Sequence, residues 1–506
     1  MESFVSSNKT IMLTALAALF FFSFFSGAWY GGDDFVHMAV LSEDSSPFAA
    51  ALHGEVYNRG TKDVNYRPLT NMIMTLIFSR DNVVVARMAI FALHVINGLL
   101  VYLILVKLQF KQGLCRFLLA MFLFNPMCNT ALFWISAIGD VLCTFFSLLA
   151  ILLFLGERTT TRAVAIALAY VLGVYSKEMV ITLPVLLLVM SMLQNRLSES
   201  LRLCFVLLCV GLALFVSRGL IIDTYFAGAR TADYFNLSGT LLVSILKYIF
   251  SMLVPFPAHS VYEYPVLLLW PILFFGLLFI VFLKADTDRH SSRNFIIAIC
   301  CVGISLLPVI FKYAPWYLYF VSVFLLLALA YLLNDIFQRP VITLAISAQV
   351  LLFVCLTGLW GSWYIDSGRK SRELLEKIHS IPEAEIIIAG LPTRAYTSIG
   401  MLSYQRHLEH ALQLFHGDGK KVHLVAPATV KNVQTSPIRE ARAKGFMLDL
   451  SEDGYSYFTA QAFALDGIKV SALGSNFLGK PNRVFLEAKT GLPLFFYENG
   501  ELGRAH

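Results

Sequence analysis

Charge is scarce in this chain, and its cysteines form no framework. Only 14% of the 506 residues are charged, whereas about a quarter are charged in an average soluble domain. The eight cysteines lie in or beside apolar stretches, none follows Cys355, and no Cys-x-x-Cys pair occurs. The sequence therefore excludes a disulfide framework and a thiolate metal site, and it argues against a wholly soluble protein.

Other common features are absent as well. Internal repeats and low-complexity linkers do not occur, and no small-residue cleavage site follows the first apolar stretch, residues 10–30. Because that stretch is long and rich in aromatic residues, we expect a retained membrane helix and not a cleaved signal peptide. The net charge of +6 fits cytosolic loops rich in Lys and Arg better than a nucleic-acid partner.

Apolar stretches fill most of the first 364 residues. The chain is 58% hydrophobic, its mean hydropathy is +0.70, and many stretches reach the roughly 18 to 25 residues of a membrane helix. We predict a polytopic α-helical membrane protein with about eleven spans. After the first span, the others are expected at residues 83–108, 114–124, 132–155, 163–175, 179–193, 201–222, 265–283, 295–311, 316–333 and 341–364.

Two further apolar stretches are not counted as spans. Residues 68–78 are too few to cross a membrane, so we expect a surface helix that begins at Pro68, a favoured first helical residue. Residues 240–254 end in Pro255-Phe256-Pro257, and we predict a re-entrant or surface segment there. With this choice the loops rich in Lys and Arg all fall on one side, which identifies that side as the cytosol.

The C-terminal part has an ordinary soluble composition. We predict a membrane domain over residues 1–364 and a small α/β domain over residues 365–506, on the outer side of the membrane. Its expected elements are strands at 384–390 and 421–425, a helix at 398–415, and a hairpin over 484–497.

A pair of acids stands directly after the first span, in Gly31-Gly32-Asp33-Asp34-Phe35. Two adjacent carboxylates are costly to place beside hydrocarbon. They suit a watery cavity where carboxylates do chemistry, or a solvated loop with a glycine turn.

The predicted topology gathers charge at membrane depth on the outer side, against the usual bias of Lys and Arg. Charge at that depth indicates a functional site. The residues concerned are Asp33, Asp34, Arg67, Asp140, Lys177, Glu178, Arg218, Arg230 and Lys312.

Such a mixed set suits a reaction on a phosphorylated lipid that carries a sugar. A carboxylate takes the proton of an incoming hydroxyl, and Lys and Arg hold the phosphate and stabilise its charge as it leaves. Aromatic side chains in the outer loops, such as Tyr66 and Tyr317, offer faces for a sugar, although a position in an interfacial aromatic belt is the simpler explanation for each one alone.

The order of these motifs resembles the GT-C superfamily of multi-spanning glycosyltransferases, which use polyprenyl-phosphate sugars. Asp33-Asp34-Phe35 is similar to that family's acidic motif in the first external loop, and Tyr66-Arg67-Pro68-Leu69-Thr70 resembles a run of the eukaryotic O-mannosyltransferases with tetratricopeptide repeats. The segment from Asn125-Pro126 to Gly139-Asp140 and the triplet Ser176-Lys177-Glu178 also match. Tyr317-Leu318-Tyr319 matches part of an Arg-Tyr-Leu-Tyr motif, with Trp316 in place of the basic residue.

The resemblance covers residues 10–335. The chain has no tetratricopeptide repeats, and its size, span number and terminal domain are closer to the bacterial and phage O-antigen glucosyltransferases of serotype conversion. That resemblance implies an inner-membrane enzyme with undecaprenyl-phosphate glucose as donor and a sugar hydroxyl of lipopolysaccharide O-antigen as acceptor.

The resemblance and the residue chemistry together suggest roles. Asp33 or Asp34 is expected to act as general base. Asp140 positions substrate or loop, or is a buried structural acid. Arg67 and Lys177 bind the donor phosphate, with Arg218, Arg230 and Lys312 as weaker candidates, and Glu178, Tyr66, Tyr317 and Tyr319 position the substrate.

Purely structural explanations are the alternatives to these roles. In these alternatives Arg67 pairs with a first-loop acid, Lys177-Glu178 is an ion pair that caps a helix, and Arg218 snorkels to the interface. No obligatory metal is expected, although adjacent aspartates can hold a divalent cation with a phosphate. A protein O-mannosyltransferase, a transporter of lipid-linked sugars and an O-antigen polymerase or ligase are the alternative functions.

Overall fold

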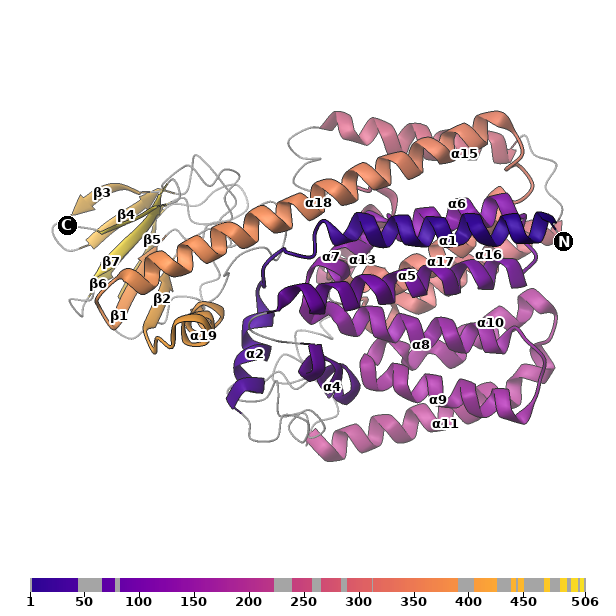
Figure 1. Cartoon of the computed structure of the whole chain (residues 1–506), viewed down its shortest axis with the longest axis horizontal. Helices are drawn as coiled ribbons and strands as arrows, with labels where there is room; N and C mark the ends of the chain where they lie inside the picture. The colour runs from indigo at the N-terminus through magenta and orange to yellow at the C-terminus, as the bar shows by residue number, and fades with distance from the viewer. Residues whose placement is uncertain are drawn as a thin grey trace. The chain divides into compact units, whose positions relative to one another are not determined.

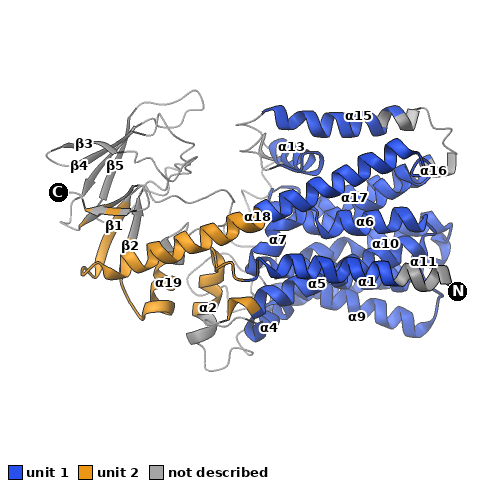
Figure 2. Cartoon of the chain, turned by 45° about the horizontal axis from the view of Figure 1, so that its top comes forward, with its two compact units in different colours: residues 1–26, 44–77, 85–359 blue, residues 27–43, 78–84, 360–506 orange. Residues whose placement is uncertain are grey.

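The computed structural model describes residues 2–43, 66–77, 82–222, 239–256, 265–283, 289–311, 313–389, 405–425, 438–442, 445–449, 468–473, 483–488, 493–498 and 501–504. The chain divides into two compact units, shown by element in Figure 1 and by unit in Figure 2. Unit 1 is formed by Met1–Ser26, Asp44–Ile77 and Val85–Leu359. Unit 2 is formed by Gly27–Glu43, Phe78–Val84 and Trp360–His506.

Unit 1 is a bundle of helices. In the described part of the chain, seven helical segments are long and apolar enough to cross a membrane, and shorter apolar helices accompany them. The fold is that of a helical membrane protein, as the composition predicts, while the count of about eleven crossings stays a prediction. The seven are Val83–Lys107, Gln112–Phe133, Ile135–Phe154, Leu197–Ile221, Ser292–Val309, Pro315–Leu333 and Pro340–Ser380.

The elements of unit 1 follow in chain order. They are α1 (Glu2–Ser23), α4 (Pro68–Ile77), α5 (Val83–Lys107), α6 (Gln112–Leu123), η2 (Pro126–Cys128), α7 (Asn129–Phe133), η3 (Ile135–Ala137), α8 (Ile138–Phe154), α9 (Thr160–Ser176), η4 (Glu178–Thr182), α10 (Leu183–Ser191), η5 (Met192–Gln194), α11 (Leu197–Ile222), α13 (Gly239–Leu253), η6 (Pro265–Leu268), α15 (Leu269–Leu283), α16 (Arg289–Leu306), η7 (Leu307–Val309), η8 (Pro315–Tyr317), α17 (Leu318–Leu333) and the first half of α18 (Pro340–Ser380).

The helices differ in how deeply they are buried. In the most apolar window of the span Ile135–Phe154, 72% of the residues are buried inside the protein, against 22% for Leu197–Ile221. Large apolar side chains such as Leu212 and Leu220 on α11 are exposed. Because an apolar helix face without a protein neighbour suits hydrocarbon, α8 lies inside the bundle and α11 presents one face to lipid.

Basic side chains gather where α8 ends and α11 begins. Arg158 donates to the Ser200 hydroxyl at 2.8 Å, and Arg293 donates to the side-chain oxygen of Asn195 at 2.9 Å. Asp140 lies in the first turn of α8, and Arg158 lies beyond its last turn. The helix has 17 residues, so about 25 Å separates this basic end from Asp140.

Two helix boundaries agree with the proline and asparagine signals in the sequence. Helix α4 begins at Pro68, and α6 ends just before Asn125-Pro126. The Asn125 side chain accepts from the Met127 N–H at 3.1 Å and so caps the short helix η2. Both boundaries are therefore confirmed.

The first helix lies earlier in the chain than predicted, because it already begins at Glu2. Helix α1 ends at Ser23 and is followed by a turn over residues 24–27, so the prediction that it continues to residue 30 is wrong. The Ser23 hydroxyl donates to the Phe20 carbonyl and the Ser26 hydroxyl to the Ser23 carbonyl. These bonds satisfy carbonyls at the helix end, and the chain then continues into unit 2.

Unit 2 combines segments from both ends of the chain. It contains α2 (Asp33–Glu43), the second half of α18, and α19 (Gln405–His416), and its strands are β1 (Glu385–Ala389), β2 (Lys421–Val425), β3 (Ile438–Arg442), β4 (Gly445–Asp449), β5 (Ile468–Leu473), β6 (Arg483–Ala488), β7 (Leu494–Glu498) and β8 (Glu501–Arg504). Helix α18 has 41 residues, about 60 Å, and so exceeds the roughly 30 Å of hydrocarbon.

The strands form two four-stranded sheets. The first has the order β2-β1-β7-β8, with β1 parallel to both β2 and β7, and the second has the order β3-β4-β6-β5 and is antiparallel. The strands predicted near residues 385 and 421 are thus confirmed. The predicted hairpin over residues 484–497 is wrong, because β6 pairs with β4 and β5 while β7 pairs with β1 and β8.

Candidate functional site

Three sequence motifs from separate parts of the chain meet in unit 1. The Thr70 hydroxyl of α4 donates to the carbonyl of Ser176, the last residue of α9, at 2.7 Å. Gly139 at the start of α8 lies against the same two residues, since a Cβ there would be 3.2 Å from the Ser176 carbonyl and 3.2 Å from the Thr70 hydroxyl. The glycine therefore allows α4, α8 and α9 to approach closely at this point.

A buried ion pair lies beside this junction. Lys177 Nζ donates to Asp140 Oδ2 at 2.5 Å, and the two side chains are 3% and 0% exposed. The other oxygen, Oδ1, is buried and accepts no hydrogen bond from the described residues. A buried acceptor without a donor is costly, which marks Asp140 as a place where a ligand hydroxyl can donate.

A second ion pair adjoins the first. The Arg67 guanidinium donates from Nε to Glu178 Oε2 at 2.9 Å and from Nη2 to Glu178 Oε1 at 2.5 Å, a two-point contact. Arg218 on α11 is near enough to stabilise the negative charge of Glu178. With Asp140 and Lys177, these residues form what we call the charged cluster: Arg67, Asp140, Lys177, Glu178 and Arg218. Among these five described residues, three are cations and two are anions.

The helix ends favour this arrangement. Asp140 lies in the first turn of α8, and Lys177 is the residue that caps the C-terminal end of α9. The partial positive charge of a helix N-terminus favours an acid, and the partial negative charge of a C-terminus favours a base. The two side chains therefore complement the dipoles of their own helices as well as each other.

Aromatic side chains line the charged cluster on one side. Lys177 Nζ lies 4.6 Å from the centre of the Tyr317 ring, and the neighbouring Trp316 packs edge-on against Trp134 at 4.8 Å between ring centres. Tyr66 packs edge-on against Tyr175, next to Ser176, at 6.2 Å. The Trp134 indole N–H is buried and donates to no described residue. The cluster thus combines cations with aromatic faces and buried polar atoms that suit a ligand.

The acidic motif belongs to unit 2. Gly32 has a φ of +60°, a left-handed conformation that favours glycine, and Asp33 and Asp34 form the first turn of α2. Asp34 is fully buried, and its Oδ2 accepts from the Gly31 N–H at 3.1 Å. Asp33 is half-buried. The glycine turn of the sequence interpretation is present, and Asp33 is the more accessible of the two acids.

Sequence reasoning did not identify a buried polar network that includes Tyr319. The Tyr319 hydroxyl lies 2.8 Å from His94 Nδ1 and accepts from Asn97 Nδ2 at 3.0 Å. Asn97 also donates to the carbonyl of Val141, next to Asp140, at 3.0 Å. His94 and Asn97 are three residues apart on α5, and polar residues on one face of an apolar span are the signal that would have revealed them. The network ties α5 and α17 to the start of α8.

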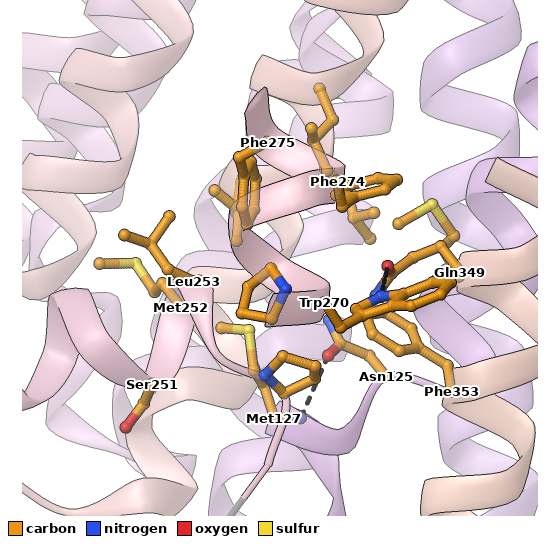
Figure 3. Close-up of a pocket in the computed structure, with 16 residues that line it drawn as sticks. Asn125, Met127, Ser251, Met252, Leu253, Trp270, Phe274, Phe275, Gln349 and Phe353 are labelled. Carbon is orange, nitrogen blue, oxygen red and sulfur yellow. Dashed lines mark hydrogen bonds between the residues drawn. The ribbon is translucent and has the colours of Figure 1, made fainter. Parts of the chain in front are cut away.

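Unit 1 also contains a small, mostly apolar groove. Figure 3 shows Trp270 donating to Gln349, at 2.7 Å, on one side of the groove and Met252 and Leu253 on the opposite side. Asn125 contributes a polar group, and the other lining residues are mostly apolar: Met121, Met127, Ser251, Pro255, Pro271, Phe274, Phe275, Leu325, Leu326, Leu329 and Phe353.

Some predicted site residues are not placed by the structure. Arg230 and Lys312 lie outside the described residues. Within the described part of the chain, no three His, Cys, Asp or Glu side chains come together in a way that could hold a metal ion.

No model of a known protein family matches the chain, and no curated protein is similar enough to match it.

Proposed function

We propose that this chain is a GT-C-type inverting glycosyltransferase that moves a hexose from a polyprenyl-phosphate donor to a hydroxyl acceptor. One observation carries the proposal: the motifs around Arg67, Asp140 and Lys177 are distant in sequence but form one charged cluster. A phosphodiester that joins a sugar to a lipid carries one negative charge, which Lys and Arg side chains bind.

The proposed reaction assigns the phosphate to unit 1. Lys177 and Arg67 bind the donor phosphate, and Arg218 adds positive charge nearby. As the bond between the sugar C1 and the phosphate oxygen breaks, its electron pair leaves with the polyprenyl phosphate, and these cations stabilise the charge that develops. Asp140 Oδ1 accepts a hydrogen bond from a hydroxyl of the sugar, and the face of the Tyr317 ring packs against the sugar.

The acceptor side of the reaction requires a base. The acceptor oxygen attacks C1 from the face opposite the phosphate, and its proton passes to a carboxylate. The resemblance to GT-C enzymes implies that the acidic motif supplies this base, and within that motif Asp33 is half-buried whereas Asp34 is fully buried and accepts from the Gly31 N–H. Asp34 then holds the turn that presents Asp33.

The apolar groove supports a lipid-linked donor. Ser251, which lines the groove, lies 2.7 Å from the Tyr313 hydroxyl, and Tyr313 precedes η8, where Tyr317 faces Lys177. An apolar lining of this kind suits part of an isoprenoid chain.

The location follows from the charges of the bundle. The end that carries Arg158 and Arg293 is assigned to the cytosol, because short loops rich in Lys and Arg stay there. The charged cluster, at the other end of α8, then faces the opposite side, the periplasm of a bacterial inner membrane. The proposed donor is undecaprenyl-phosphate glucose, and the proposed acceptor is an O-antigen sugar of lipopolysaccharide.

The test is a transfer assay with the purified chain in lipid nanodiscs. Undecaprenyl-phosphate glucose and other polyprenyl-phosphate hexoses are each offered with O-antigen oligosaccharides, and the product mass is measured. We expect one hexose to be added from one donor, a loss of at least about 100-fold for Lys177→Met, and unchanged rates for the exposed control Lys107→Met. No transfer from any donor, or equal rates in both variants, would reject the proposal.

A further inference from the structure

One aromatic side chain of α19 contacts the residues on both sides of the acidic pair. The ring centre of Phe415 lies 5.2 Å from that of Trp29, 6.4 Å from that of Tyr30 and 6.2 Å from that of Phe35. Trp29, Tyr30 and Phe35 are buried. Phe415 therefore packs against the segment just before the glycine turn and against the residue that follows Asp34.

Helix α18 approaches the same segment. A Cβ on Gly368 would be 2.8 Å from the backbone nitrogen of Trp29 and 2.8 Å from its Cβ, so only a glycine lets the two backbones come this close. One turn further along α18, the Arg372 guanidinium lies 5.3 Å from the centre of the Trp29 ring. The segment Gly27–Glu43 is thus part of the same compact unit as the C-terminal region.

We propose that α18 and α19 of unit 2 position the acidic motif, with Phe415 and Gly368 as positioning residues that fix the direction of the Asp33 carboxylate. The inference rests on the proposed function in that it takes Asp33 to be the base. It assigns a role to the C-terminal region: side chains of this region pack against the loop after the first helix and hold its conformation.

The physical reason lies in the shape of the loop. Gly31 and Gly32 impose little conformation of their own, and fixing a glycine costs more backbone entropy than fixing any other residue. Contacts on both sides of the turn offset that cost. A base must also be aligned within about 0.5 Å to act efficiently, so a loosened loop slows proton removal before it affects binding of the donor.

The experiment compares Phe415→Ala, Phe415→Trp and Gly368→Val with Gln413→Ala, an exposed residue on the same helix. Each full-length variant is assayed for kcat and for donor binding. We expect Phe415→Ala and Gly368→Val to lower kcat by about 10- to 100-fold with donor affinity within twofold of the wild type. Phe415→Trp should keep most of the activity, and Gln413→Ala should keep all of it.

A readout that needs no activity accompanies the assay. Hydrogen–deuterium exchange of residues 27–39 should rise in Phe415→Ala and Gly368→Val and stay unchanged in Gln413→Ala. If exchange rises but the wild-type protein transfers no sugar, the proposed function fails and the positioning role stands. Unchanged exchange in both variants, or full kcat in Phe415→Ala, overturns the positioning role even where the protein is a transferase.

Discussion

At the scale of single residues, the charged cluster pairs each of its two acids with a base from another segment. Lys177 pairs with Asp140 and Arg67 with Glu178, so the neighbours Lys177 and Glu178 each reach a different partner. The first pair is almost fully buried, whereas 39% of the Glu178 side chain is exposed. Removing one member of a buried pair leaves a charge without compensation, and this cost exceeds that of losing an exposed pair.

The buried pair makes a stability prediction. Lys177→Met should destabilise the protein by about 3–5 kcal/mol, because the Asp140 carboxylate stays buried without its partner. The double variant Asp140→Leu with Lys177→Met should recover most of this loss, since it removes both charges, but it should transfer no sugar. Thermal unfolding in detergent and the transfer assay measure the two effects separately. A double variant as unstable as Lys177→Met would contradict the pairing.

At the scale of elements, the junction of α4, α8 and α9 depends on a glycine. Gly139 lies where a Cβ would be 3.2 Å from both a backbone carbonyl and a hydroxyl, which is closer than most side chains approach. On α16, by contrast, a Cβ at Gly303 meets nothing within 4 Å. The two glycines have the same chemistry in different surroundings and form a matched pair.

Alanine should affect the stability of the protein differently at the two positions. Gly139→Ala should destabilise unit 1 by about 1–3 kcal/mol through overpacking and should lower the transfer rate, because it moves Asp140 relative to Lys177. Gly303→Ala should be neutral or stabilise by up to about 1 kcal/mol, since alanine favours a helix. Unfolding midpoints of both variants provide the check. Equal midpoints would show that the contact at Gly139 is not tight.

The elements also show how far sequence reasoning reaches. Apolar length and proline positions were sufficient to locate most helices of unit 1, including the start of α4 at Pro68. The end of α1 at Ser23 was missed because the apolar stretch continues past it. Ser26 and Gly27 are followed by aromatic residues, so the sequence itself gives no clear end to the helix. The hairpin over residues 484–497 failed because strand partners depend on contacts distant in sequence, which local turn residues do not reveal.

At the scale of the whole molecule, the sequence singled out the charged residues of the cluster but did not predict how they pair. Few polar residues occur in the spans, so Asp140 and Lys177 stood out. Whether Lys177 pairs with Glu178 or with Asp140 depends on the packing of α8 on α9, which periodicity does not determine. The association of Gly27–Glu43 with the C-terminal region could likewise not be predicted from the sequence, because it joins segments from opposite ends of the chain.

The account depends on one claim, that the charged cluster binds the phosphate of a lipid-linked sugar. Native mass spectrometry of the purified protein with undecaprenyl-phosphate glucose measures this binding directly. The wild type and Asp33→Asn should bind the donor equally, and Lys177→Met and Arg67→Ala should each bind it at least about 10-fold more weakly, since each loses a charged contact. Equal binding by all four proteins, or binding by none, would contradict the account.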